Sequence, residues 1–259
     1  MGDQTILYEV TDHVAKITMN RPGRLNSFTE EMHLAFKDVL KKARFDPEVR
    51  SIVITGAGKA FNAGQDLGEV TGTSVNYGEI LRRRYNPLIE LLQTIEKPVI
   101  AAVNGAAAGA GMSLALACDL RLVSEQATFH NAFIHIGLIP DSGGCYFLPR
   151  IIGIGKALEL AMTGDRLTAN EAYHLGLANH VYPSETFAQD VMAYAVRLAA
   201  LPTKGIGLIK RTMLKSLQMS CTEALAYEAY IQEIASQTED HQEGLQAFLE
   251  KRAPVFRGS

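Results

Sequence analysis

Cysteine is scarce in this chain, and its positions exclude two kinds of structural site. The 259 residues include three cysteines, Cys118, Cys145 and Cys221, which are far apart and form no CxxC pair. An odd number of widely spaced cysteines argues against a disulfide framework and against a cysteine-based zinc site. We therefore expect free thiols in a reducing compartment.

The chain also lacks long apolar runs and a strong net charge. No stretch reaches the roughly 18–20 apolar residues of a membrane span, and residues 1–5 lack the basic and apolar regions of a signal peptide. The formal net charge is −3, which gives the molecule no general attraction for nucleic acid or for an anionic membrane. These features predict a cytoplasmic protein without a nucleic-acid or membrane partner.

Motifs that bind nucleotides or metals are missing as well. The segment 56–60 lacks the spacing and the following Ser or Thr of a phosphate-binding loop, and the glycines of 105–111 do not follow the dinucleotide order. The closest of seven scattered histidines, His130 and His135, are five residues apart on a strand-like stretch. That spacing predicts that they point to opposite faces. We expect neither a metal nor a tightly bound cofactor.

Short apolar runs alternate with helical patterns in the first part of the chain. Two alternating stretches within 6–20 predict a hairpin. Residues 59–66 and 71–78 are expected to be loops, the second of them mobile. Buried strands are expected at 51–55, 99–103 and 119–124, with helices that begin at Thr29 and cover 80–95 and 112–118. This alternation, with 47% hydrophobic residues, predicts an α/β fold.

Helical patterns dominate after residue 157. The last three helices are expected at 206–217, 221–236 and 239–251, and the first of them carries apolar residues on more than one side. Such a terminal layer more often meets a neighbouring subunit than water. We therefore divide the chain into a core over 1–200 and a C-terminal helical oligomerisation region over 201–259.

Two stretches of small residues predict exposed backbone amides. Residues 106–111 follow the strand 99–103, carry no side chain larger than methyl, and lead into the helix at 112–118. A small-residue turn at a helix N-terminus presents free N–H groups and lets a ligand approach the backbone. A second site of this kind is expected at 63–65. Tight turns without a binding role explain these glycines as well.

The residues at these turns suggest acyl chemistry. If the two turns converge, the N–H groups of Gln65 and Ala110 form an oxyanion hole, which stabilises charge that develops on a carbonyl oxygen. Asp141 in the turn 139–144 is then the natural acid or base, because a largely apolar pocket raises the pKa of a carboxyl group. A turn-capping role for this aspartate, before Ser-Gly-Gly, stays open.

Several motifs run in order along the whole chain. They include Phe61-Asn62-Ala63-Gly64-Gln65-Asp66-Leu67, Ala102-Val103-Asn104-Gly105, Gly109-Ala110-Gly111, Gly137-Leu138-Ile139-Pro140 and Phe248-Leu249-Glu250-Lys251-Arg252-Ala253-Pro254. On these motifs the chain resembles the crotonase superfamily, also called the enoyl-CoA hydratase/isomerase family. The resemblance implies a crotonase-like spiral of ββα units with a C-terminal helical trimerisation region, assembled as a trimer or a dimer of trimers.

The resemblance also implies a substrate and its binding residues. The substrate is an acyl-CoA thioester, so coenzyme A is part of the substrate and not a bound cofactor. The oxyanion-hole amides of the family fall on Gln65 and Ala110. The implied contacts to coenzyme A are Arg24, Ala63, Gln65, Asp66 and Leu67, with Phe248 and Lys251 as candidates from the C-terminal helix.

Three positions depart from the family's hydratases. The two glutamates with which those enzymes activate water fall on Ser113 and Phe133, whereas a carboxylate stands at Asp141, where they have glycine. This arrangement is similar to that of ring-epoxide isomerases in the superfamily. It predicts an acyl-CoA isomerase that moves protons on a thioester enolate, with a 3-enoyl chain or a phenylacetyl ring epoxide as the acyl group. A short-chain enoyl-CoA hydratase is the nearest alternative.

Two further alternatives belong to other classes of protein. Ser113 in Gly-Met-Ser-Leu-Ala resembles a nucleophile elbow, and Asp141 with His174 or His180 follows in the order of a serine hydrolase. A buried core serine explains Ser113 better. Some members of the superfamily bind RNA or act as scaffolds, and the arginines 82–84 are the basic cluster that fits this role. A solvated helix face or a phosphate contact explains them better.

Overall fold

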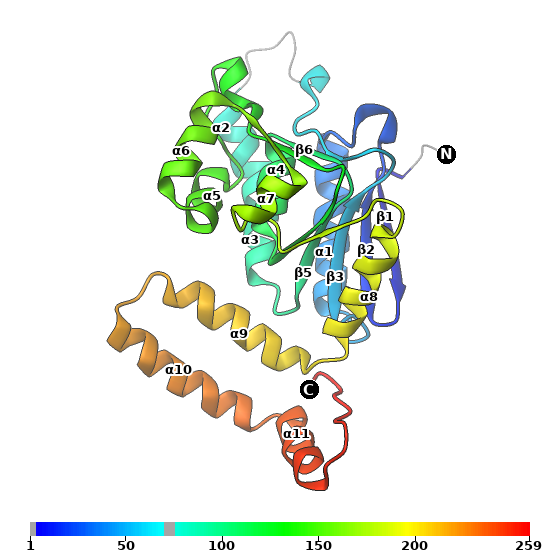
Figure 1. The fold of residues 1–259 in the computed structure, drawn as a ribbon, viewed down its shortest axis with the longest axis vertical. Coiled ribbons are helices and arrows are strands. Elements are labelled where there is room, and N and C mark those ends of the chain that lie inside the picture. The colour runs from blue at the N-terminus through cyan, green and yellow to red at the C-terminus, as the bar shows by residue number, and fades with distance from the viewer. Residues whose placement is uncertain (1–3, 70–75) are drawn as a thin grey trace.

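The larger of two β-sheets begins with a hairpin of alternating apolar residues. The computed structural model describes residues 4–69 and 76–259, and within them this sheet has six strands in the order β1-β2-β3-β5-β7-β10 (Figure 1). The predicted hairpin is confirmed because β1 and β2 pair antiparallel, and the other neighbours pair parallel. The strands are β1 (Ile6–Thr11), β2 (Val14–Met19), β3 (Ser51–Gly56), β5 (Val99–Val103), β7 (Leu120–Ser124) and β10 (His180–Tyr182).

The second sheet is built from short strands that the sequence does not mark clearly. Its order within the described residues is β4-β6-β8-β9. The loops expected at 59–66 and 106–111 are corrected in part, because each contributes a strand that pairs with a parallel neighbour despite the low strand propensity of alanine. The strands are β4 (Ala60–Asn62), β6 (Ala106–Ala108), β8 (Thr128–His130) and β9 (Arg166–Thr168).

Three similar units connect the two sheets. The chain passes from β3 to β4, from β5 to β6 and from β7 to β8, so that each unit places one strand in each sheet. Helical segments follow each pair, which confirms the expected spiral of ββα units. Since β4, β6 and β8 are parallel neighbours, the loops that follow them emerge at the same edge of the small sheet. This edge positions the candidate site.

Capping residues and apolar spacing set the helices. Thr29 accepts a hydrogen bond from the N–H of Met32 and begins α1, as predicted, and Thr168 with Glu171 forms a capping box at α7. The helices are α1 (Glu30–Phe45), α2 (Tyr77–Ile80), α3 (Asn86–Thr94), α4 (Ala110–Ala117), α5 (Gly144–Ile152), α6 (Ile154–Thr163), α7 (Ala169–His174), α8 (Phe187–Ala199), α9 (Thr203–Ser216), α10 (Cys221–Ser236) and α11 (Glu239–Glu250).

The helix predicted at 80–95 is longer and interrupted. It begins with α2, continues as the π-helical turn Leu81–Tyr85, and resumes as α3. Pro87 follows the π-helical turn directly, and because proline has no N–H it cannot donate an intrahelical hydrogen bond at this point. Of the loop predicted at 71–78, residues 71–75 lie outside the described part of the chain, whereas Tyr77 already belongs to α2.

Two apolar clusters sandwich the larger sheet. Ile52 and Ile54 of β3 face the main core with α1, α3 and α4, whereas Val53 between them faces α8 on the other side. Every residue of α4 is buried, which explains why its sequence is apolar on all sides. The predicted buried helix is thereby confirmed.

The last three helices extend away from this body. Figure 1 shows α9 and α10 beside each other below the sheets, with α11 beyond them near the C-terminus. Lys210 of α9 pairs with Asp119 at 2.9 Å and ties this layer to the body. Large apolar side chains on the layer are exposed, among them Met213 at 69% and Phe248 at 80%. The predicted helices are confirmed, and the division at residue 200 stays a prediction.

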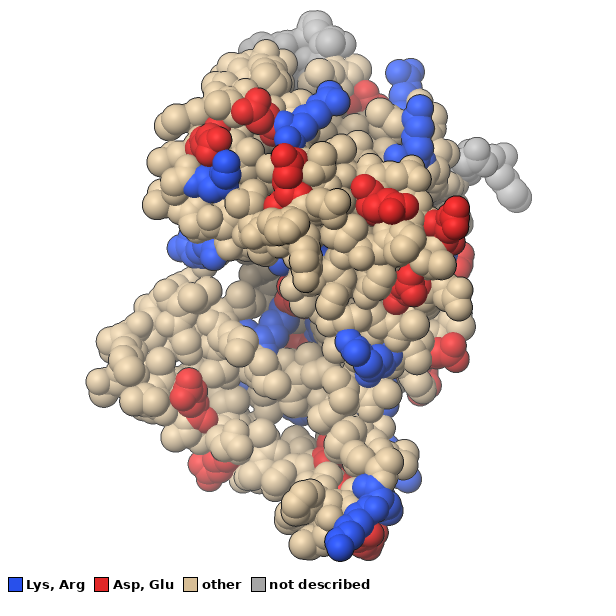
Figure 2. All heavy atoms as spheres, in the orientation of Figure 1, with Lys and Arg blue, Asp and Glu red and all other residues tan. Residues whose placement is uncertain are grey.

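The surface carries mixed charge. Figure 2 shows acidic and basic side chains scattered over the visible face of the body, with few charged side chains over α9 and α10. No helix among the described residues combines the length and the hydropathy that crossing a membrane requires. The three cysteines are unpaired, and Cys118 alone among them is buried.

Candidate active site

Two loops meet at the edge of the smaller sheet. One follows β4 and contains Gly64, and the other follows β6 and contains Ala110. At Gly64 the backbone has φ of +90°, and a Cβ there would lie 3.1 Å from the oxygen of Ala108 and 3.4 Å from the nitrogen of Ala110. Glycine is required at this position both for its backbone conformation and for the close approach. The two loops expected to converge therefore lie in direct contact.

Two backbone donors at these loops have no hydrogen-bond acceptor among the residues that the structure describes. Ala110 is the first residue of α4, so its N–H has no partner within the helix. The Asp66 N–H donates to the oxygen of Phe28 at 2.9 Å, and the preceding amide, that of Gln65, therefore does not face Phe28. Among the described residues no acceptor is hydrogen-bonded to the Gln65 N–H. Both donors can stabilise a negative oxygen, aided at Ala110 by the helix dipole.

A tight turn directs Asp141. Ser142 and Gly143 have φ of 51° and 85°, and the N–H of Gly144 donates to the main-chain oxygen of Asp141 at 2.8 Å. The Ser142 hydroxyl donates to Oδ1 of Asp141, also at 2.8 Å. Burial raises the pKa of Asp141, and the bond from Ser142 offsets part of that rise. The carboxyl group is thus a stronger base than an exposed aspartate.

One cavity of about 190 Å³ brings these groups together. Gln65, Ala110 and Asp141 all lie on its wall, and Asp141 is the only carboxylate among the described residues that line it. The remaining wall is mostly apolar and includes three aromatic rings. Its other lining residues are Ala63, Gly64, Leu67, Tyr77, Ile80, Leu81, Tyr85, Gly109, Ala132, Phe133, Ile136 and Leu138.

The candidate contacts to coenzyme A divide into two groups. Ala63, Gln65 and Leu67 line the cavity. Asp66 instead forms an ion pair with Arg21 at 3.0 Å. Burial alone would raise the pKa of Asp66, but its bonds from Arg21 and the Gly68 amide, with the nearby Arg24 charge, lower it overall. Arg24 therefore lies close to the same loop, and these candidates form one region.

Phe248 and Lys251 lie elsewhere. They are at the end of α11, which Figure 1 places at the opposite end of the molecule from α2. Neither lines the cavity within this chain, and the structure does not bring them to the other candidates. Their role as coenzyme A contacts stays a prediction.

The sequence did not identify the wall formed by α2 and the π-helical turn. Tyr77, Leu81 and Tyr85 all line the cavity. The sequence signal that could have indicated this wall is Pro87, because a proline within a helical pattern marks a discontinuity in the helix. Tyr85 is the most informative of the three, because its hydroxyl donates to Oε1 of Gln65 at 2.6 Å.

The histidine prediction was wrong. The rings of His130 and His135 do not point to opposite faces, because their centroids are 5.4 Å apart. The strand ends at His130, and residues Ala132–Ile136 form a 3-10 helix that turns the chain back. Within residues 4–69 and 76–259, no group of three or more His, Cys, Asp or Glu side chains could hold a metal ion.

The residues that suggested a serine hydrolase or an RNA-binding protein have other surroundings in the structure. Ser113 is 2% exposed inside α4 and does not line the cavity, so the core reading of this serine is supported. Arg84 forms ion pairs with Glu30 and Glu69, and Arg83 pairs with Glu79. Two of the three clustered arginines are thus partly neutralised.

Comparison with known proteins agrees with this geometry. A family model described as enoyl-CoA hydratase/isomerase matches residues 9–259. The chain belongs to the enoyl-CoA hydratase/isomerase family. It is 42% identical to a 1,2-epoxyphenylacetyl-CoA isomerase of Escherichia coli strain K12, with 98% of each chain covered. It is 40% identical to a probable enoyl-CoA hydratase of Rhodobacter capsulatus, with both chains fully covered.

Solved structures confirm the crotonase fold. An enoyl-CoA hydratase from Bacillus anthracis superposes with a TM-score of 0.95 at 34% identity, over 99% of this chain and 100% of that one. The chain is therefore an enzyme of the enoyl-CoA hydratase/isomerase family. Its relatives' names include both reactions, so the family alone does not distinguish isomerisation from hydration.

Proposed function

We propose that this enzyme is an acyl-CoA isomerase that moves protons on a thioester enolate. The observation that carries the proposal is Asp141, which is the single carboxylate on the cavity wall within residues 4–69 and 76–259, beside the amides of Gln65 and Ala110. Where the family's hydratases place two glutamates, this chain has buried Ser113 and apolar Phe133. Water activation by a carboxylate pair has no basis here, whereas a single base suffices for two sequential proton transfers.

The mechanism follows from the positions of the donors and the base. The thioester oxygen accepts hydrogen bonds from the N–H groups of Gln65 and Ala110, which acidifies the protons on the adjacent carbon. Asp141 removes one of these protons, and the electron pair of the broken C–H bond delocalises onto the thioester oxygen. With a 3-enoyl substrate, the protonated Asp141 then returns the proton to the γ-carbon. The double bond moves from position 3 to position 2, and the enzyme is restored.

The cavity wall favours a ring-bearing acyl group. Tyr77, Tyr85 and Phe133 place three aromatic rings around the space beside Asp141, and aromatic walls pack well against a flat ring. Together with the similarity to a 1,2-epoxyphenylacetyl-CoA isomerase, this supports a ring epoxide of phenylacetyl-CoA as the substrate. The same oxyanion donors and base would assist its rearrangement to the seven-membered oxepin.

A homotrimer or a dimer of trimers is part of the proposal. A cleft of about 530 Å³ between α9 and the body is lined by Ile206, Ile209 and Met213, and Ile209 and Met213 are 57% and 69% exposed. Apolar exposure of this kind is typical of a subunit interface. Light scattering coupled to size exclusion tests the assembly. The unpaired cysteines fit the predicted cytoplasmic location.

A panel of coenzyme A esters tests the function. The purified enzyme is incubated in deuterated water with a 3-enoyl-CoA, a 2-enoyl-CoA and the ring epoxide of phenylacetyl-CoA, and product mass and absorbance are recorded together. An isomerase returns products of unchanged mass apart from exchanged deuterium. Conversion of the 2-enoyl ester to a product heavier by one water, as the fastest reaction, would favour the hydratase and overturn the proposal.

A further inference from the structure

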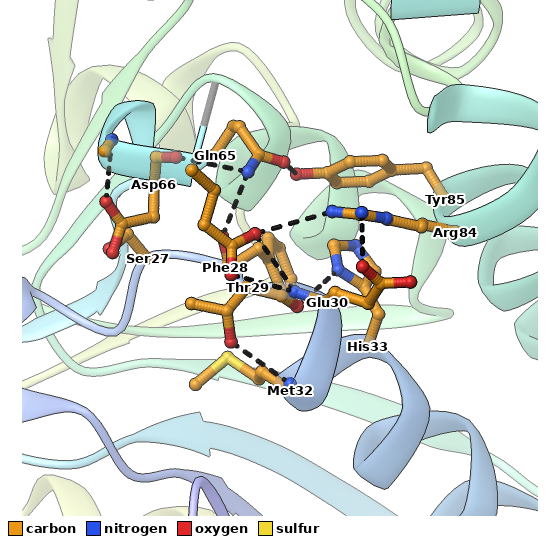
Figure 3. A network of polar contacts seen from close by, with 12 residues as sticks. Ser27, Phe28, Thr29, Glu30, Met32, His33, Gln65, Asp66, Arg84 and Tyr85 are labelled. Carbon is orange, nitrogen blue, oxygen red and sulfur yellow. Dashed lines mark hydrogen bonds and ion pairs between the residues drawn. The ribbon is translucent and has the colours of Figure 1, made fainter. Parts of the chain in front are cut away.

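We propose that Tyr85 is a positioning residue that fixes the oxyanion-hole amide of Gln65; this inference rests on the proposed function. The Tyr85 hydroxyl donates to Oε1 of Gln65 at 2.6 Å (Figure 3). The other end of the same side chain, Nε2, donates to the main-chain oxygens of Phe28 and Asp66, at 3.3 Å each. The short bond from the phenol is therefore the strongest constraint on this side chain.

The phenol is held rigidly before any ligand arrives. Its ring is 4% exposed, and it packs edge-on against His33 and Phe28, with centroid distances of 4.2 and 5.7 Å. Burial raises the pKa of Tyr85, and the charges of Asp141 and Glu69 raise it further, against Arg84. The hydroxyl thus stays protonated at every working pH and always has a proton to donate to Gln65.

The local fold aims this side chain. Tyr85 is the last residue of the π-helical turn Leu81–Tyr85. One extra residue per turn rotates every later side chain by about 100° relative to a continuous α-helix. π-helical turns occur frequently at functional sites, and the contact between this turn and the oxyanion loop agrees with that tendency.

The consequence concerns geometry in the transition state. Gln65 is the residue whose main-chain N–H faces the cavity. A hydrogen bond that fixes its side chain therefore limits the rotation of that peptide group. The hydrogen bond from Tyr85 lowers the free energy mainly in the transition state, when charge develops on the thioester oxygen. Its loss should therefore lower kcat without a matching change in KM. Tyr85 itself needs no contact with the reacting atoms.

Two single variants and their combination test this role. Tyr85→Phe keeps the packed ring and removes the donor, whereas Gln65→Leu removes the acceptor and keeps the main-chain amide. We expect each to lower kcat roughly 10- to 100-fold, with less than about a threefold change in KM. The double variant should be no worse than Gln65→Leu alone, because the bond from Tyr85 is already absent in that variant. Tyr173→Phe, on exposed α7, is the matched control.

A spectroscopic reading separates positioning from structure. Phenylacetyl-CoA labelled with ¹³C at the thioester carbonyl is bound to each folded variant, and the infrared C=O stretch is recorded. Wild type should shift the band to lower frequency, and both single variants should shift it less. An unchanged shift and rate in Tyr85→Phe and Gln65→Leu would overturn the inference and leave the proposed function intact. No shift in wild type would instead overturn the proposed function and this inference with it.

Discussion

The backbone of Gly64 lies against that of Ala110, and a Cβ on Gly64 would stand 3.4 Å from the Ala110 nitrogen. Gly64 also has φ of +90°, a conformation that alanine adopts only under strain. We expect Gly64→Ala to push the two donor loops apart and to lower kcat about 10²- to 10³-fold, the loss typical of one oxyanion donor. Steady-state kinetics measures the effect.

Gly155→Ala is the control for this substitution. Gly155 is in α6, and no atom lies within 4 Å of its Cβ position. This variant should keep wild-type kinetics and should unfold at the same or a slightly higher temperature. If Gly64→Ala were as active as Gly155→Ala, the Gly64 contact would have no part in catalysis.

Asp141→Asn should remove the base while keeping the shape of the cavity. We expect turnover to fall about 10²- to 10⁴-fold, with nearly unchanged binding of the coenzyme A ester, because the oxyanion donors remain. Binding is followed by calorimetry with phenylacetyl-CoA, and turnover by product absorbance. Asp165→Asn, on an exposed loop, controls for the loss of one charge. A near-wild-type rate in Asp141→Asn would contradict the role of this carboxylate.

The same carboxylate should set the acid limb of the rate profile. Asp141 must be ionised to take a proton from substrate, and burial raises its pKa. The value of kcat/KM should therefore fall about tenfold per unit as the pH drops below this raised pKa. The onset should lie at a higher pH than an exposed aspartate would give. A profile that stays flat down to the ordinary range of an aspartate would exclude Asp141 as the base.

Burial of this carboxylate also costs stability. Because the pKa of Asp141 is higher in the folded chain than in the unfolded one, the folded state binds the proton more tightly, and stability falls as the pH rises through that window. Asparagine avoids this loss. At neutral pH, Asp141→Asn should melt about 1–4 °C above wild type, and the difference should shrink in acid. Thermal unfolding at both pH values checks the prediction; a lower melting temperature at neutral pH would contradict it.

The sequence was sufficient for the parts of the fold that depend on local patterns. Alternation marked the β1–β2 hairpin, Thr29 marked the start of α1, and a fully apolar run marked α4. It was insufficient for β4 and β6, since three-residue strands such as Ala106–Ala108 exist because neighbouring strands pair with them and not because of their own propensity. The crotonase resemblance, carried by motifs along the whole chain, supplied the spiral that local patterns alone did not.

The candidate site shows the same division. The sequence singled out Gln65, Ala110 and Asp141, which line one cavity, because each stands in a turn whose small residues are visible in the sequence. The wall that includes Tyr85 was missed, because a π-helical turn such as Leu81–Tyr85 leaves no periodic pattern in the sequence. The error at His130 and His135 has a similar cause. A period of two was assumed where the strand had already ended and a 3-10 helix had begun.

His33 provides a test of packing behind the site that does not depend on activity. It is 3% exposed between the rings of Phe28 and Tyr85; its Nδ1 lies 2.9 Å from the Thr29 oxygen, and its Nε2 is buried without a partner. Burial lowers its pKa to about 4, and the charge of Arg84 contributes, against the bond to Thr29. The imidazole is therefore neutral in the folded protein.

The sign of the pH effect follows from that shift. The unfolded chain binds a proton at His33 near pH 6.5, and the folded chain does not until about pH 4, so acidification across this window favours unfolding. We expect this group to remove on the order of 3 kcal/mol from the free energy of unfolding. His33→Phe, measured by urea denaturation at pH 7 and pH 4.5, should lose markedly less stability on acidification than wild type. The exposed substitution His241→Gln should lose as much as wild type, and an equal loss in His33→Phe would mean that His33 is not buried as a neutral ring.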